Sequence, residues 1–120
     1  MSTILTVDDS ASMRQMVAFS LKSGGHAVLE AFDGVDGLEK AKEHAVDAFI
    51  VDVNMPRMDG ISLVQELRAI PEYAHTPILM LTTESSDEKK RQGRDAGATG
   101  WIVKPFNPEQ LVNTLRRLIT

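Results

Sequence analysis

Ala48-Phe49-Ile50-Val51-Asp52 decides the fold, because four consecutive apolar residues run directly into a carboxylate. Apolar runs of this kind are typical of strands that helices bury on both faces. Three more runs, at 4–7, 78–81 and 101–103, end in Asp8-Asp9, Thr82-Thr83 and Lys104-Pro105. In an open parallel sheet, ligands bind outside the carboxyl ends of the strands. We therefore expect three carboxylates, a hydroxyl and an ammonium group to meet at one edge of a sheet.

The chain alternates such runs with helical patterns from end to end, which predicts an α/β fold with a parallel sheet. The strands are expected at 4–7, 27–31, 48–53, 78–81 and 101–103, and five helical segments lie between and after them. The run at 27–31 is interrupted by Glu30, which favours an edge strand. We expect one domain over residues 1–120, with no output domain attached.

Helix boundaries have recognisable signals. Asp59 is expected to cap the third helix, and Asn107 before Pro108 the last one. Ser85 with Glu88 predicts a capping box for the fourth helix. That helix carries no large apolar side chain between 86 and 95 and has Gly93 inside it. A helix with so little apolar surface is expected to be held loosely.

Composition excludes several function classes. The chain has no cysteine, so it has no disulfide framework, thiolate metal site or thiol catalysis. A net charge of −4 is opposite to that of a typical nucleic-acid-binding domain, so no nucleic acid is expected as a partner. No membrane-spanning stretch and no secretion signal are visible in the sequence. We expect a cytoplasmic protein that does not contact a membrane.

The acidic residues Asp8, Asp9 and Asp52 predict a chemistry of their own. Carboxylates held close together disfavour folding unless a cation neutralises them. Mg²⁺ prefers one or two carboxylates together with water and phosphate oxygens, and Lys104 can contact a phosphate oxygen as a point charge. A carboxylate can also be the nucleophile that forms an aspartyl phosphate. We assign that role to Asp52, because its strand is expected to be central, and assign the metal to all three acids.

These motifs together resemble the receiver domains of two-component response regulators over essentially the whole chain. The acidic pair, the phosphoacceptor, the switch hydroxyl and the Lys-Pro pair of that family correspond to Asp8-Asp9, Asp52, Thr82 and Lys104-Pro105. Residues 55–60, Met-Pro-Arg-Met-Asp-Gly, are similar to a family loop. The resemblance implies a flavodoxin-like (βα)5 fold with strand order 2-1-3-4-5. It also implies a metal ligand from the Asn54 carbonyl and a cis peptide bond before Pro105.

Among receivers, the chain is most similar to the single-domain chemotaxis response regulators. This resemblance implies phosphoryl transfer from a histidine kinase to Asp52 with Mg²⁺, and then a changed surface on the fourth helix, fifth strand and last helix. The implied partners are the kinase, a downstream target such as a flagellar switch protein, and a phosphatase. The resemblance also implies that Asn54 and Glu84 stand at the positions that tune phosphoryl lifetime in the family. Trp101 takes the switch position that is usually tyrosine or phenylalanine.

Lys89 and Lys90 are our candidates for contacting the partner, because the fourth helix is basic and lacks an apolar stripe. We expect no classical enzyme, but a phosphoacceptor that labels itself from small donors and dephosphorylates itself. A haloacid-dehalogenase-like phosphohydrolase would carry a D-x-D pattern on the nucleophile strand, and here Asn54 takes the second position. A receiver that acts as a phosphate sink or as a phosphorelay intermediate outside motility remains the alternative.

Overall fold

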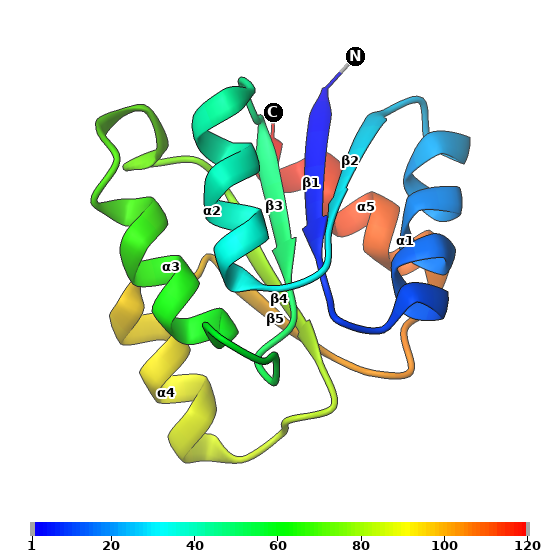
Figure 1. Ribbon diagram of the computed structural model, residues 1–120. Coiled ribbons are helices and arrows are strands. Elements are labelled where there is room, and N and C mark those ends of the chain that lie inside the picture. The colour runs from blue at the N-terminus through cyan, green and yellow to red at the C-terminus, as the bar shows by residue number, and fades with distance from the viewer. Residues whose placement is uncertain (1, 120) are drawn as a thin grey trace.

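The structure is a computed structural model that describes residues 2–119 (Figure 1). Its strands are β1 (Thr3–Val7), β2 (Ala27–Ala31), β3 (Ala48–Val51), β4 (Ile78–Thr82) and β5 (Gly100–Val103). Its helices are α1 (Ala11–Ser23), α2 (Gly34–Glu43), α3 (Gly60–Arg68), α4 (Asp87–Ala96) and α5 (Pro108–Ile119), with a short 3₁₀ turn η1 (Pro71–Tyr73). None of the helices in this described part is long and apolar enough to cross a membrane.

All five strands are parallel and are ordered β2-β1-β3-β4-β5, as the family resemblance implied. The predicted edge position of residues 27–31 is confirmed, and β3 lies at the centre of the sheet. It ends at Val51, two residues earlier than the sequence predicted. The strands run toward the lower edge of the sheet in Figure 1, and polar residues follow β1, β3, β4 and β5 at their carboxyl ends.

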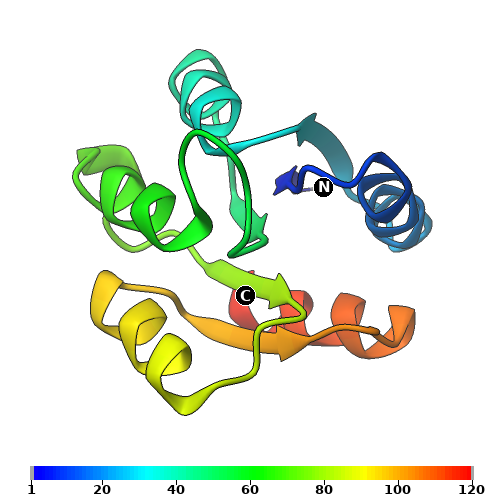
Figure 2. The same cartoon turned by 60° about the horizontal axis from the view of Figure 1, so that its bottom comes forward.

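Helices cover both faces of the sheet: α1 and α5 pack on one face, and α2, α3 and α4 on the other (Figures 1 and 2). Successive residues of a strand point to opposite faces, and the two halves of the core follow this alternation. Ile4 and Ile50 pack with α1 and α5, whereas Leu5, Phe49 and Val51 pack with the other three helices. A sheet that is buried on both faces leaves its strand ends as the natural place for polar groups.

The helix ends agree with the sequence at two places and differ at a third. Asp59 caps α3 and the side chain of Asn107 accepts from the Gln110 N–H at 3.1 Å, both as predicted. The prediction of Ser85 as the cap of α4 is wrong, because the cap is Ser86, which accepts from the Lys89 N–H at 3.2 Å. The chain after β4 stays irregular through Ser86, with the Glu84 carboxylate accepting from the Ser86 N–H.

Gly93 has a packing reason to stand inside α4. The residue is buried, and a Cβ there would lie 2.7 Å from the Trp101 ring. The helix therefore lies close to β5 at this point, although it has no large apolar side chain of its own. Glycine costs about 1 kcal/mol in a helix relative to alanine, and here it makes room for an indole.

Candidate functional site

The site residues follow directly on the strands, and backbone hydrogen bonds hold them there. The ladder continues for one step beyond the strands, with N–H to carbonyl bonds from Asp8 to Ala31 (3.1 Å), Asp52 to Val7 (3.0 Å) and Lys104 to Thr82 (2.8 Å). Each of these three residues is therefore fixed by a neighbouring strand. The peptide bond between Lys104 and Pro105 is cis, as the resemblance implied.

The structure brings Asp8, Asp9 and Asp52 together. One carboxylate oxygen of each lies within 4.8 Å of the others. Asp8 and Asp52 are buried, with 4% and 7% of their surface exposed, whereas Asp9 is exposed. Oxygen donors from carboxylates are the ligands that Mg²⁺ takes, and an exposed member leaves an open side for water or phosphate oxygens. The donor set fits a hard divalent cation.

Lys104 supplies the nearest positive charge to these carboxylates. Its Nζ donates to Asp8 Oδ2 at 2.8 Å and lies 3.5 Å from Asp52 Oδ2. Only 10% of the lysine side chain is exposed, so the ammonium group is held rather than free to swing in solvent. The compensating lysine predicted from the sequence is therefore in place, between the two buried acids.

The Asp52 carboxyl has a raised pKa, chiefly because burial disfavours its ionised form. A hydrogen bond from the Thr82 hydroxyl lowers the pKa, the charge of Asp8 raises it, and the charge of Lys104 lowers it. The balance leaves a carboxylate whose charge is unfavourable in its surroundings, and a bound cation would stabilise that charge. Perturbed carboxyls of this kind concentrate at functional sites.

The hydroxyl and aromatic residues predicted as a switch lie on adjacent strands. Thr82 is fully buried at the end of β4, and its Oγ1 accepts from the Glu84 N–H at 3.2 Å. The indole Nε1 of Trp101 donates to the Glu84 carbonyl at 3.0 Å. The segment after β4 is therefore hydrogen-bonded both to the Thr82 hydroxyl and to the Trp101 indole. These two bonds couple the position of the hydroxyl to that of the indole.

The loop after β3 closes tightly beside Asp52. The Gly60 N–H donates to the Val53 carbonyl at 2.8 Å, and a Cβ at position 60 would collide with the Asp52 carbonyl oxygen. Only glycine fits there. Asn54, whose backbone carbonyl was expected to face the metal, lies in this loop with an exposed side chain.

The expected partner residues Lys89 and Lys90 lie on α4, and both are half-buried. Lys90 lines a small groove with Arg94 and Trp101. Basic side chains of α4 therefore lie next to the Trp101 indole, which is hydrogen-bonded to Glu84 in the segment after β4. Their role as partner contacts stays a prediction.

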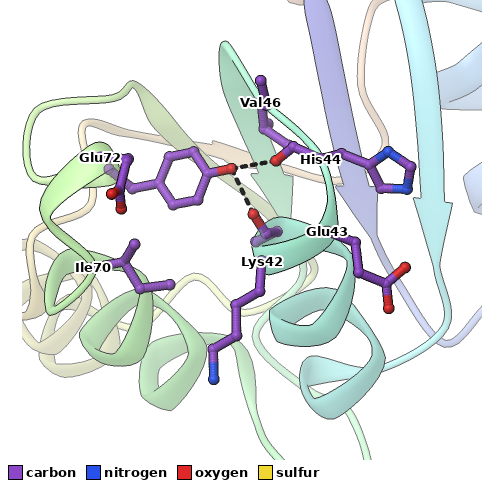
Figure 3. Close-up of a pocket in the computed structure, with 9 residues that line it drawn as sticks. Lys42, Glu43, His44, Val46, Ile70 and Glu72 are labelled. Atoms are coloured by element: carbon purple, nitrogen blue, oxygen red, sulfur yellow. Dashed lines mark hydrogen bonds between the residues drawn. The ribbon is translucent and has the colours of Figure 1, made fainter.

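A larger hollow, about 550 Å³ in volume, lies at the opposite end of the sheet, before β3 and β4 begin (Figure 3). The Tyr73 hydroxyl donates to the carbonyls of Ala41 and His44, both at 2.6 Å, and so closes the end of α2. The charged side chains of Lys42, Glu43 and Glu72 line the hollow but do not converge on one point. This tyrosine was not singled out from the sequence, because nothing local marks a contact 32 residues away.

Comparisons with known proteins agree with this geometry. The family model of the response regulator receiver domain matches residues 4–116, and the chain belongs to that family. It is similar to the chemotaxis protein CheY4 of Vibrio cholerae, at 52% identity over 98% of both chains with a TM-score of 0.94. The match extends to a receiver domain from Pseudomonas aeruginosa PAO1 solved with a magnesium ion in its active-site cleft, at 29% identity over 98% and 97% of the two chains with a TM-score of 0.91.

The curated relatives belong to longer regulators. The chain is 39% identical over 116 residues to the response regulator MprA of Mycobacterium leprae, covering 97% of this chain and 50% of that protein. It is 38% identical to a gliding motility regulatory protein of Myxococcus xanthus, covering 96% of this chain and 15% of that protein. The chain thus spans half or less of these relatives. It is a phosphoacceptor signalling domain of a two-component system and not a classical enzyme.

Proposed function

We propose that this chain receives a phosphoryl group on Asp52 from the phosphohistidine of a kinase. The Asp52 carboxylate oxygen attacks phosphorus as the phosphorus–nitrogen bond breaks, and the electron pair of that bond stays on the imidazole of the donor. The observation that carries the proposal is the meeting of three carboxylates, a lysine with only 10% of its side chain exposed and a buried hydroxyl at the carboxyl ends of four strands. Little is left for such a site to do beyond positioning and charge neutralisation.

Asp8, Asp9, Asp52 and the Asn54 carbonyl would hold Mg²⁺, which when bound neutralises charge on the transferring phosphoryl oxygens. Lys104 lies within reach of the same oxygens, because its Nζ is already 3.5 Å from Asp52 Oδ2. A small donor such as acetyl phosphate would serve in place of the kinase, and water would later remove the phosphoryl group. Asn54 and Glu84 would tune its lifetime.

The output would follow from the phosphoryl charge. A new dianion on Asp52 attracts the Thr82 hydroxyl and the Lys104 ammonium, which is a local event able to bias a two-state element. Thr82 and Trp101 both bond to Glu84, so a displaced hydroxyl would move the start of α4 and the indole. The surface of α4, β5 and α5, including Lys89 and Lys90, would then bind a target differently.

We further propose that this receiver acts in the cytoplasm, in chemotaxis, with a flagellar switch protein as target and a phosphatase as antagonist. The similarity to CheY4 over 98% of both chains supports this assignment. A phosphate sink or phosphorelay intermediate outside motility is the alternative, since the response regulator MprA is also similar. Phosphorylation-dependent binding to a flagellar switch protein supports the first, and its absence the second.

The experiment that tests phosphoacceptance is the intact mass of the protein after incubation with acetyl phosphate, with Mg²⁺ or with EDTA. The wild type should gain one labile phosphoryl group only with Mg²⁺, and Asp52→Asn should gain none. Asp59→Asn is the matched control, because it removes an exposed carboxylate from the same loop while asparagine still caps α3. A folded wild type that gains no mass, or a labelled Asp52→Asn, would contradict the proposal.

A further inference from the structure

An ion pair between the buried carboxylate of Asp33 and the exposed guanidinium of Arg57 ties the loop after β3 to the turn after β2. Asp33 is 2% exposed, and its carboxylate accepts from Arg57 Nε at 2.6 Å and from Arg57 Nη2 at 3.1 Å. It also accepts from the Asp36 N–H at 2.8 Å and so caps α2. Two parallel bonds to one carboxylate fix the guanidinium in orientation as well as in position. The pair joins residues 24 apart in the chain.

The backbone of this loop needs such a restraint. Arg57 has φ of +66°, and among the described residues other than glycine it alone has a positive φ. A non-glycine residue keeps that conformation only where its surroundings hold it. Here the guanidinium bonds to Asp33 and lies over the Phe32 ring, 5.8 Å from its centre. Two neighbouring residues of the β2–α2 turn therefore hold one side chain of the loop.

Backbone packing joins the same two segments a second time. A Cβ added at Gly34 would lie within 2.8 Å of Cβ and Cγ of Met58 and would collide with the Met58 carbonyl oxygen. Position 34 follows Asp33, and Met58 follows Arg57, so the ion pair and the close contact are adjacent. The turn and the loop are thus fitted together along two consecutive residues each.

The loop held in this way begins at the proposed metal site. Asp52 precedes it, Asn54 lies within it, and its far end is closed by the bond from the Gly60 N–H to the Val53 carbonyl. In the middle of this loop, the charged side chain of Arg57 bonds to Asp33 in the turn after β2. Without that anchor, the loop would keep the contact of Met58 with Gly34 and the packing of Met55 on the core, but no charged group of its middle part would bond to another element.

We propose that Asp33 and Arg57 are positioning residues for the metal site, holding the β3–α3 loop so that the Asn54 carbonyl is presented to the cation. The inference rests on the proposed function, and neither residue touches the reacting atoms. Removing a residue that orients a metal ligand without touching the metal commonly weakens metal affinity by about 10- to 100-fold. We expect loss of the pair to weaken Mg²⁺ binding while leaving the chemistry at saturating Mg²⁺ nearly intact.

Arg57→Gln is the decisive variant, because electrostatics and positioning predict opposite signs. Removing a positive charge near the site would by itself strengthen cation binding. Loss of positioning instead weakens it, and we expect the Mg²⁺ dissociation constant, measured by titration calorimetry, to rise by about tenfold. The labelling rate with acetyl phosphate at saturating Mg²⁺ should stay within about twofold of wild type. Arg91→Gln, which removes an exposed charge from α4, is the matched control and should change neither quantity.

Asp33→Ser tests the other partner, since serine can still cap α2 but cannot pair with the guanidinium. It should weaken Mg²⁺ binding about as much as Arg57→Gln, and the double variant no further, because both remove one interaction. Arg57→Lys keeps the charge but not the two parallel bonds and should fall between wild type and Arg57→Gln. If Arg57→Gln does not fold, Arg57→Lys provides the test. An Mg²⁺ affinity of Arg57→Lys equal to that of wild type would then overturn the inference.

The outcomes separate this inference from the proposed function. If the wild type binds Mg²⁺ through Asp52 and Arg57→Gln binds Mg²⁺ equally or more tightly, the positioning role alone is overturned. Wild-type protein whose Mg²⁺ binding is unchanged in Asp52→Asn overturns the metal site and the positioning role together. A weaker Mg²⁺ affinity in Arg57→Gln with an unchanged saturated rate supports both.

Discussion

Asp52→Asn is expected to stabilise the folded protein when no divalent cation is present. Asparagine keeps the size and shape of the side chain and removes its charge. The charge is unfavourable where it stands, because the carboxylate is 7% exposed and burial together with Asp8 raises its pKa. A residue required for the proposed reaction therefore lowers the free energy of unfolding.

The magnitude can be estimated from the distances. At an effective dielectric constant of 20, unit charges 4.8 Å apart, the limit for the three acids, repel by about 3.5 kcal/mol. The Lys104 ammonium at 3.5 Å attracts Asp52 by about 4.7 kcal/mol on the same scale. Solvent weakens the repulsion from the exposed Asp9, but two repulsions and the burial of the charge still outweigh one attraction. We expect the free energy of unfolding to rise by about 1–2 kcal/mol.

The assay is urea unfolding in EDTA, followed by the fluorescence of Trp101, the single tryptophan. The midpoint should rise in Asp52→Asn with an unchanged dependence on urea concentration. The control Asp59→Asn should shift the free energy of unfolding by less than about 0.5 kcal/mol, because its carboxylate is exposed and asparagine also caps a helix. Saturating Mg²⁺ should stabilise the wild type more than Asp52→Asn and close the gap, since a ligand stabilises the state that binds it.

The pH dependence gives the same prediction a second test. The pKa of Asp52 is higher in the folded than in the unfolded protein, so the folded state binds the proton more tightly. The stability gap should be complete above the folded pKa and should shrink as the pH falls through that pKa toward 3.8, the ordinary pKa of an aspartate. A variant that is less stable than wild type in EDTA at neutral pH would refute the reasoning, because the bonds to Thr82 and Lys104 would then outweigh burial and repulsion.

Three further variants test other parts of the account. Lys104→Met should lower the free energy of unfolding in EDTA by about 3 kcal/mol, because two buried carboxylates lose their cation, and Mg²⁺ should restore most of the loss in urea titrations. Tyr73→Phe should cost about 1–3 kcal/mol in the same assay, since two backbone carbonyls at the end of α2 lose their donor. Gly60→Ala should lower the thermal midpoint and slow acetyl phosphate labelling, because its Cβ collides with the backbone of Asp52; unchanged values in calorimetry and mass spectrometry would contradict this.

The sequence predicted the fold and the centre of the site because both depend on local patterns. Continuous apolar runs identified buried parallel strands, and one topological rule brought their polar ends together. Predicting the site required no knowledge of side-chain orientation, because each of its residues follows or ends a strand: Asp8, Asp52, Thr82 and Lys104. The strand order itself came from the family resemblance and not from the residues alone.

Contacts between loops could not be predicted in this way. Asp33 before Gly34 looks like an ordinary helix cap, and nothing near it indicates that Arg57 will lie against it in the fold. The predicted cap of α4 is wrong by one residue because Ser85 and Ser86 are chemically alike, and only the path of the segment after β4 distinguishes them. The packing of Gly93 on Trp101 likewise depends on how α4 lies against the sheet.

The measurement that tests the central claim most directly is chemical mapping of the phosphorylated residue. Borohydride reduces an acyl phosphate to an alcohol, so protein labelled with acetyl phosphate and Mg²⁺ and then reduced should carry homoserine in place of the aspartate that held the phosphoryl group. Peptide mass spectrometry should find homoserine at position 52 in wild type and at no position in the EDTA control. Homoserine at Asp8 or Asp9, or its absence from a protein that had gained a phosphoryl mass, would contradict the assignment of Asp52 as the phosphoacceptor.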